Sequence, residues 1–329
     1  MSPDTTLLAR ARGAILGVES SAPDAEALMG LVLRGNPRAL APEYPLVFGE
    51  GAPGELLVLR DEDGTPLSAC ATLLREWEVS GRRFRAGLIG SVATDASCRG
   101  IGLGARLLEG ALAHLRERGC LFAMLWADEP GFYERRGFVR FGSERNHVLD
   151  PHVVGIPEGL EGRVRPFEPG DLARVHELHA AHSQRIERTQ EELRQLLAIP
   201  GMTILVHEQA GEVDGYACAG KGGDLQGVVH DWGGAPEVVL SLAHAHATAL
   251  DHPVVVLGPE PGSPHSSFFE QAGMFASTGI LGMGVLLDVD RARHMAQDAS
   301  ISQLDELFPP GAPGGPLWAS PFAWGLDSI

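Results

Sequence analysis

The stretch that decides the fold is Cys98–Leu108, CRGIGLGARLL. It has glycines at positions 100, 102 and 104, and an apolar helical pattern follows directly. Because glycine has no Cβ, the backbone here can approach another molecule closely. A helix N-terminus adds unpaired N–H groups and the positive end of the helix dipole. The stretch therefore predicts a phosphate site, whose ligand could be a dinucleotide, a nucleoside triphosphate or coenzyme A.

The elements around this stretch predict a mixed α/β sheet flanked by helices. Two long strands, Leu67–Val79 and Phe84–Thr94, are separated by a tight turn and should be antiparallel neighbours. The glycines then lead into a helix over Leu103–Arg118, which has one apolar face. The unbroken apolar run Leu121–Ala127 is typical of a strand covered on both faces. A short helix is expected at Phe132–Arg136.

Two nucleotide-binding interpretations of the glycines fit less well. Residues Gly100, Gly102 and Ala105 match a loose dinucleotide fingerprint. However, a Rossmann loop should open a parallel βαβ unit, whereas the strand before these glycines has an antiparallel partner upstream. A nucleoside triphosphate loop needs Gly-Lys-Ser/Thr, and Lys221 is the only lysine of the chain. A nucleotide-dependent oxidoreductase therefore stays the third hypothesis.

A third interpretation rests on two motifs. Read as Arg-x-x-Gly-x-Gly, residues Arg99, Gly102 and Gly104 resemble the acyl-CoA pyrophosphate loop of the GNAT (Gcn5-related N-acetyltransferase) superfamily. The segment Phe132–Phe138, FYERRGF, is similar to the aromatic-Tyr-x-x-x-Gly-Phe signature that follows the buried strand in that family. The resemblance covers Glu55–Leu149, with both motifs in the right order and at the right separation.

The resemblance implies acetyl-CoA, or another acyl-CoA, as co-substrate and no metal. The backbone N–H groups of seven successive residues could wrap its diphosphate, namely Arg99, Gly100, Ile101, Gly102, Leu103, Gly104 and Ala105. The family further implies that the strand before the loop diverges from Leu121–Ala127. Pantetheine would enter that gap and pair with the backbone of Val92, Ala93 and Thr94, where an N–H could also polarise the thioester carbonyl.

Acyl transfer also needs an acid for the leaving thiolate and a base for the amine. The resemblance makes Tyr133 the predicted acid, because many GNAT enzymes have a tyrosine hydroxyl facing the CoA sulfur at this position. An ordinary core tyrosine is the alternative. No carboxylate lies on Phe84–Thr94, where the family often has one. The base is left open among Glu76, Glu78, Asp327, the terminal carboxylate of Ile329 and water.

The order of elements partly recurs later in the chain, which predicts a tandem duplication. We expect a first GNAT domain at residues 1–152, which binds acyl-CoA and is catalytic, a linker at 153–162 and a GNAT-like domain at 163–290. The second domain has DWGGAPEVV, residues 231–239, where the phosphate loop should be, so it is expected to be degenerate. Residues 291–329 are expected to form a helix and a Pro/Gly/aromatic tail.

Two hypotheses account for the end of the tail, Leu317–Ile329. It could complete the active site of the first domain, which lacks an evident base. Alternatively, its aromatic residues, Trp318, Phe322 and Trp324, could simply cover an apolar groove between the domains.

The amino-acid composition argues against several classes of partner. The net charge of −17 argues against nucleic acid and anionic membranes as partners, and favours cationic small molecules. The four cysteines have no metal-site spacing, and no apolar run is long enough to span a bilayer. These features predict a cytoplasmic location.

The resulting hypothesis is an acyl-CoA-dependent N-acyltransferase that acts on a primary amine by direct attack. The acceptor, a small-molecule amine or a peptide or protein amine, is left open, as is the oligomeric state. A non-catalytic acyl-CoA-binding regulatory protein is the alternative, and Tyr133 favours the enzyme.

Overall fold

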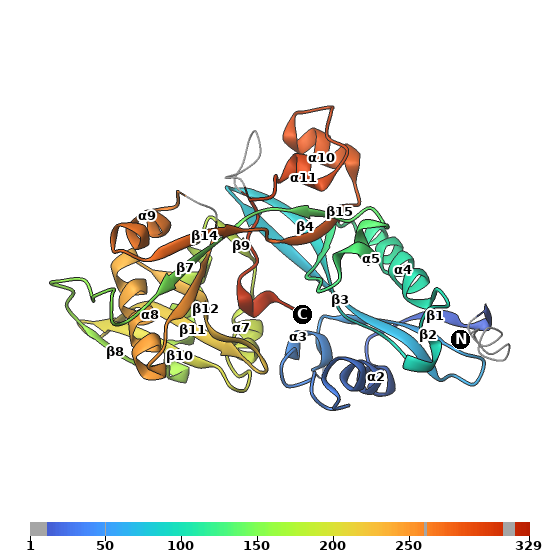
Figure 1. Ribbon diagram of the computed structural model, residues 1–329, viewed down its shortest axis with the longest axis horizontal. Coiled ribbons are helices and arrows are strands. Elements are labelled where there is room, and N and C mark those ends of the chain that lie inside the picture. The colour runs from blue at the N-terminus through green and yellow to red at the C-terminus, as the bar shows by residue number, and fades with distance from the viewer. Residues whose placement is uncertain (1–11, 50, 260–261, 312–319) are drawn as a thin grey trace.

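The computed structural model describes residues 12–49, 51–259, 262–311 and 320–329. Two mixed sheets lie side by side, each flanked by helices (Figure 1). This confirms the predicted α/β class and the two-domain architecture. The first sheet has the strand order β1-β2-β3-β4-β5-β15-β6, and β9 pairs with the far end of β3. Its strands are β1 (Ile15–Glu19), β2 (Glu55–Arg60), β3 (Pro66–Val79), β4 (Arg82–Thr94), β5 (Phe122–Leu125), β6 (Val139–Phe141), β9 (Gln184–Ile186) and β15 (Gly282–Leu286).

Helices cover both faces of the first sheet. Helix α4 (Leu103–Glu117) packs its apolar stripe against Leu57 and Leu59 of β2. Helix α2 (Pro23–Arg34) packs on the other face, where Val58 points. Side chains alternate along a strand, so β2 is apolar on both faces because helices cover both. The short helices α3 (Pro45–Phe48) and α5 (Pro130–Glu134) complete this side of the molecule.

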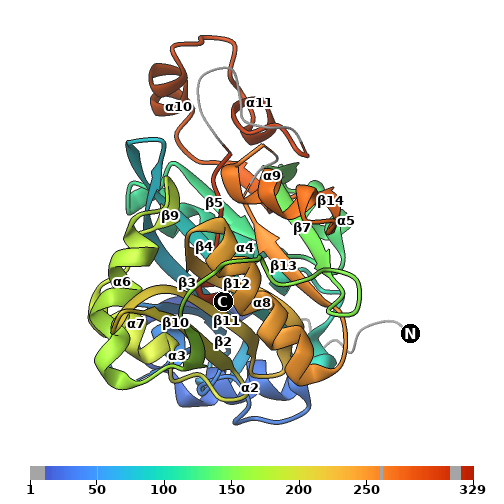
Figure 2. The same ribbon diagram turned by 90° about the vertical axis from the view of Figure 1, so that its left-hand side faces the viewer.

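The second sheet has the order β14-β7-β13-β12-β11-β10-β8. Helices α6 and α8 cover its opposite faces, since a Cβ on Gly233 would meet Leu178 of α6 and one on Gly215 would meet Val238 of α8. Figure 2, which looks onto this half, shows α8 lying across the sheet. Its strands are β7 (Glu144–Leu149), β8 (Arg163–Pro166), β10 (Thr203–Gln209), β11 (Glu212–Lys221), β12 (Asp224–Gly234), β13 (Val254–Gly258) and β14 (Phe275–Gly279). The helices of this half are α6 (Leu172–Ala180), α7 (Gln190–Leu196), α8 (Pro236–Leu250) and α9 (Pro264–Gln271), and α10 (Val289–Ala296) and α11 (Leu304–Leu307) follow β15.

A two-stranded ribbon joins the sheets and corrects the predicted domain boundaries. Strand β6 belongs to the first sheet and β7 to the second, and β14 and β15 return the other way beside them. Figure 1 shows the two paths running together between the sheets. Thus β7, expected within the first domain at 1–152, pairs in the second sheet. Likewise β15, expected within 163–290, lies between β5 and β6 of the first. Local sequence patterns could not show this, because strand type does not specify the pairing partner.

The region around β15 contributes much of the core of the first sheet. Leu304 and Phe308, which follow β15, are fully buried, and Phe308 packs against Phe84 and Phe122.

In the described part of the chain, no helix is long and apolar enough to cross a membrane.

We expect that a fragment of residues 1–152 does not fold cooperatively. It lacks β15, which leaves β5 and β6 without their shared partner, and it lacks Leu304 and Phe308, whose burial is worth about 2–5 kcal/mol each. Thermal unfolding followed by circular dichroism checks this. Co-expression with residues 153–329 should restore one cooperative transition. If a monomeric fragment melts cooperatively near the melting temperature of the full chain, the first sheet does not need β15, and the expectation is wrong.

Candidate active site

The predicted phosphate loop, Arg99–Ala105, has exposed residues at Arg99, Gly100 and Gly102, and its glycines have the backbone geometry that glycine favours. Gly100 and Gly102 have φ of 78° and 92°, and a Cβ built on either would point into open space. Gly102 is the N-cap of α4, whose first intrahelical bond runs from the N–H of Arg106 to the carbonyl of Gly102. The N–H groups of Leu103, Gly104 and Ala105 therefore precede the helical ladder and are oriented toward the N-terminal end of the helix.

Arg99 and the end of β4 lie next to this helix terminus. The Arg99 guanidinium is exposed and its Nε donates to the carbonyl of Thr94 at 3.3 Å. Leu103 is buried in the core beneath α4, whereas Ile101 is only partly covered. The loop thus combines backbone donors, the positive end of a 15-residue helix and one accessible cation, which together suit an anionic ligand.

Strands β4 and β5 diverge beside the loop, as the resemblance implies. They pair in parallel only where Ala86–Leu88 faces Phe122–Met124, and β5 ends at Leu125 while β4 continues to Thr94. A bulge at Ser91, with φ of 51°, shifts the register of β4 against β3. Residues Val92–Thr94 therefore have a strand partner on the β3 side alone among the described residues, which leaves backbone groups available to an extended ligand.

Helix α5 brings its aromatic residues to the same place. A Cβ built on Gly104 would lie 3.6 Å from both the Phe132 ring and the Thr94 hydroxyl. Tyr133 contacts Phe132 edge-on, with 5.0 Å between ring centroids, and packs on Phe138. The two sequence motifs, 36 positions apart between residues 102 and 138, are thus adjacent in space.

Tyr133 is partly buried and protonated at neutral pH. Burial raises the pKa of Tyr133, and the neighbouring Cys70 thiol raises it further. Its hydroxyl has no hydrogen-bond partner among the described residues, so it is free to donate. These properties fit a proton donor and are not those of a structural tyrosine held by its hydroxyl.

Three of the carboxylates named as possible bases are engaged elsewhere. Glu76 pairs with Arg85 at 2.6 Å, and Glu78 pairs with Arg83 and Arg185. Both lie at the far end of β3. Glu76 is five residues from the position opposite Gly90, or roughly 17 Å along a strand.

Asp327 is fully buried, and both of its oxygens accept hydrogen bonds from Arg188, at 2.9 and 2.6 Å. It is therefore part of a buried ion pair within the protein and has no path to an acceptor amine.

Ile329 lies directly on β4. A Cβ added to Gly90 would overlap the main-chain carbonyl group of Ile329, so only glycine leaves room for this contact. Gly90 precedes the bulge at Ser91, which places Ile329 beside the diverging edge of β4. Of the tail residues named from the sequence, Leu317 and Trp318 lie outside the described residues.

Ile329 and Tyr133 flank the edge of β4 from opposite sides. Ile89 belongs to the core under α4 together with Tyr133, whereas Leu88 belongs to the core on the other face together with Ile329. Gly90 shares the face of Leu88 because side chains alternate along the strand. A ligand held along Val92–Thr94 would therefore have Tyr133 on one side and Ile329 on the other.

The second sheet has a similar divergence, but a side chain fills it. Strands β12 and β13 pair in parallel only where Val228 and Val229 face Val255 and Val256. Beyond this point the Trp232 indole donates to the carbonyl of Leu257 at 2.6 Å and so bridges the two strands. The gap that stays open in the first sheet is thus closed in the second, and the degeneracy of the second domain stays a prediction.

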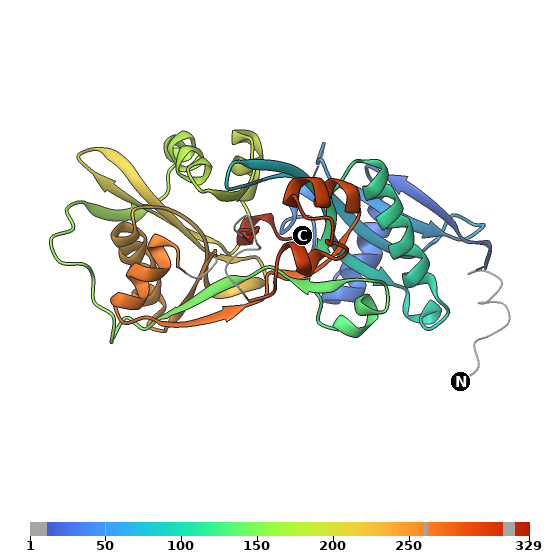
Figure 3. The ribbon, with the colours of Figure 1, turned by 90° about the horizontal axis from the view of Figure 1, so that it is seen from above.

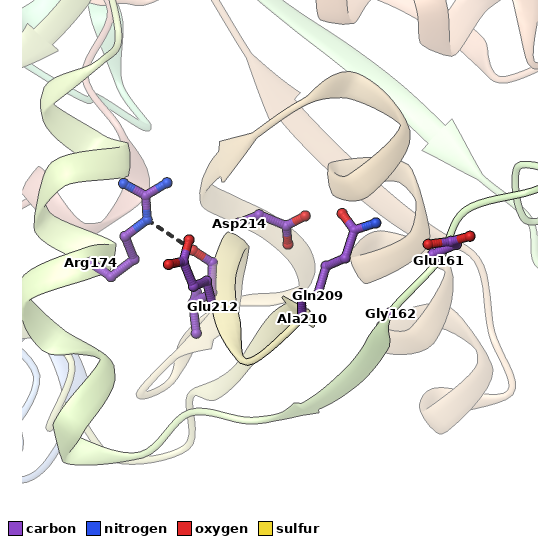
Figure 4. A pocket seen from close by; sticks show the side chains of 8 residues that line it. Glu161, Gly162, Arg174, Gln209, Ala210, Glu212 and Asp214 are labelled. Carbon is purple, nitrogen blue, oxygen red and sulfur yellow. Dashed lines mark hydrogen bonds between the residues drawn. The ribbon is translucent and has the colours of Figure 1, made fainter.

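A hollow of about 530 Å³ elsewhere has no part in this arrangement (Figure 4). It lies on the second domain at the turn between β10 and β11, and its lining includes Glu161, Glu212 and Asp214. Arg174 on its wall donates to the carbonyl of Val213. None of the predicted site residues contributes to it.

The comparisons with known proteins agree with the geometry. The sequence model of the acetyltransferase (GNAT) domain matches residues 48–141. Glucosamine 6-phosphate N-acetyltransferase 1 of Oryza sativa subsp. japonica is 35% identical over 91 residues, which are 27% of this chain and 55% of that protein. The chain thus spans about half the length of this curated relative.

Solved structures resemble both halves of the chain. A GCN5-related N-acetyltransferase from Kribbella flavida has a TM-score of 0.63 at 19% identity, over 86% of this chain and 74% of that one. A probable N-acyltransferase of unknown function from Enterococcus faecalis V583 has a TM-score of 0.65 at 13% identity, over 83% and 73%. At these identities the likeness shows the fold alone. Residues 48–141 are thus similar to the GNAT acetyltransferase domain, and the chain as a whole has the same two-domain fold as these solved structures.

Proposed function

We propose that the chain transfers an acetyl group from acetyl-CoA to a primary amine. The observation that carries the proposal is the meeting of three features: the open N-terminus of α4, the unpaired edge of β4 and the hydroxyl of Tyr133. The relative from Oryza sativa bears the name of an acetyltransferase that acts on an amino sugar phosphate, which supports this class of reaction.

The residues present fit acetyl-CoA. The N–H groups of Leu103–Ala105 and the Arg99 guanidinium would hold the diphosphate, and the positive φ of Gly100 and Gly102 keeps side chains away from it. The backbone of Val92–Thr94 would pair with the amides of pantetheine, much as a neighbouring strand would.

The reaction follows from the placement of Tyr133. The neutral amine attacks the thioester carbonyl carbon, a C–N bond forms, and a backbone N–H of β4 stabilises the oxyanion. The C–S bond then breaks, and the Tyr133 hydroxyl protonates the leaving thiolate. The amine loses a proton on the opposite side. Because Glu76, Glu78 and Asp327 are engaged elsewhere, we infer that water beside the main chain of Ile329 accepts that proton.

The alternatives account for less of the structure. A regulatory protein that only binds acyl-CoA would use the loop but would not need a free tyrosine hydroxyl beside it. The sequence argument against a dinucleotide site considered only the antiparallel partner of β4. In the structure, β4 also runs parallel to β5, to which α4 connects it. The pairing spans three residues only, and β4 is antiparallel to β3 along most of its length, so the sheet is not of Rossmann type.

Replacing Gly102 with valine should abolish acetyl-CoA binding, since the new side chain would occupy the space proposed for the diphosphate. Calorimetry with the unmodified chain should give one site per chain. The matched control is Gly64→Val, which has φ of 82°, equally open surroundings and a position in the turn between β2 and β3. Both variants should lose about 1–3 kcal/mol of stability through backbone strain, but only Gly102→Val should lose binding. Equal binding by both variants would refute the loop assignment.

Replacing Tyr133 with phenylalanine should lower kcat by about 10²–10⁴-fold, the usual contribution of a general acid, and leave the acetyl-CoA Kd nearly unchanged. Release of free thiol from acetyl-CoA in the presence of a panel of amines measures this. Unaltered kcat in a folded variant would return Tyr133 to a packing role, and an absence of turnover by the unmodified chain with every amine would favour the regulatory alternative.

A further inference from the structure

The second domain holds the end of the chain through a dense set of buried contacts. Lys221, at the end of β11, is fully buried, and its ammonium donates to the carbonyl of Ser328 at 2.6 Å and to the Ser328 hydroxyl at 2.9 Å. It also reaches the carbonyls of Gly325 and Leu326, at 3.2 and 3.3 Å. All four oxygens belong to residues 325–328, so the only lysine of the chain is directed at the tail.

A second buried cation holds the same segment. Arg188 donates to both oxygens of Asp327, and also to Asp231 of β12 at 2.7 Å. All three side chains are inaccessible to solvent. Tyr216 donates to the other oxygen of Asp231 at 2.7 Å, which completes a network between the second sheet and the tail.

Aromatic packing fixes the preceding residues. The Trp324 indole lies edge-on to Trp232, with 4.9 Å between centroids, and donates to the carbonyl of Gln184. A Cβ on Gly325 would overlap the ring of His230. Figures 1 and 3 show the end of the chain lying between the two sheets.

The first domain closes over Lys221 from the other side. The Tyr44 ring lies 5.1 Å from the ammonium, and the Tyr44 hydroxyl donates to Asp224 at 2.6 Å. Asp224 also pairs with Arg34 of α2. Lys221 therefore stands where β11, the tail and the first domain meet, with Ile329 one residue beyond its last acceptor.

We propose that Lys221 is a positioning residue for the acetyl-transfer site of the first domain. By holding residues 325–328 it fixes Ile329 against Gly90, on the side of β4 from which the amine approaches. On this proposal the degenerate second domain contributes to catalysis because it binds the tail and holds it in position. This inference rests on the proposed function.

Three proteins test the proposal: the unmodified chain, Lys221→Met, and Arg75→Met as the matched control. Arg75 is also a buried cation between the halves, bonded to Glu192 and to the carbonyl of Glu187, but none of its described partners is in the tail. Both substitutions should lower the melting temperature, because each leaves buried acceptor oxygens without their hydrogen-bond donor. Hydrogen exchange of the amides of residues 325–329, measured without substrate, should rise at least about tenfold in Lys221→Met only.

Kinetics separate a positioning role from a purely structural one. In Lys221→Met, kcat/KM for the amine should fall by about 10²-fold, the effect expected of a displacement near 1 Å, while the acetyl-CoA Kd stays within about twofold. Arg75→Met should keep the unmodified value per folded molecule. Normal exchange of the tail in Lys221→Met, or a mobile tail with unchanged kinetics, would overturn the proposal.

Asp327→Asn provides a second variant should Lys221→Met fail to fold. It is isosteric and weakens the contact with Arg188 while Asp231 still pairs that guanidinium. We expect faster exchange of residues 325–329 together with a smaller loss of kcat/KM. Loss of kcat without faster exchange would contradict the proposal. If the unmodified chain acetylates no amine, the proposed function itself fails, whereas the exchange data still decide whether Lys221 holds the tail.

Discussion

The ribbon that exchanges strands between the sheets is the constraint on which the rest of the molecule depends. Strands β6 and β15 pair in the first sheet, and their continuations β7 and β14 pair in the second. Each sheet therefore contains a strand from the other part of the chain, and neither sheet can move far without breaking a ladder. Because this connection is rigid, it can fix the positions of atoms that meet between the halves, such as those of Ile329 and Gly90. Catalysis needs such positional precision.

The network of Arg188, Asp231 and Asp327 contributes more to fixing the position of the tail than to the free energy of unfolding. Taking three charged groups out of water is costly, and similar networks in other proteins can be replaced by apolar residues without loss. Once formed, however, the network tolerates no change of partner, because a displaced member would leave an unpaired buried charge at a cost of about 3–5 kcal/mol. It therefore selects one register of the tail, which an apolar groove filled by Phe322 and Trp324 would not do.

The sequence predicted those parts of the fold that depend on local signals. The hairpin of β3 and β4, the glycine-capped start of α4 and the short helix with Tyr133 all have turn or capping residues at fixed spacing. The place of β15 could not be predicted, since its partners on β5 lie about 160 positions away and any apolar strand could fill that gap. Asp327 was among the candidate bases, because a sequence does not distinguish a buried carboxylate that is already paired from a free one.

These contacts indicate what the second domain contributes to the structure, because it holds the tail in place. On the proposal that the second domain is a duplicate without a phosphate loop, the residues in the gap between its diverging strands are free to change. Here Trp232 closes that gap on one side and packs against Trp324 of the tail on the other. Trp232 therefore both bridges β12 and β13 and supports the tail. Because the first domain has no carboxylate on β4, the proposed reaction needs a proton acceptor from water or from another part of the chain, and the second domain holds Ile329 beside β4.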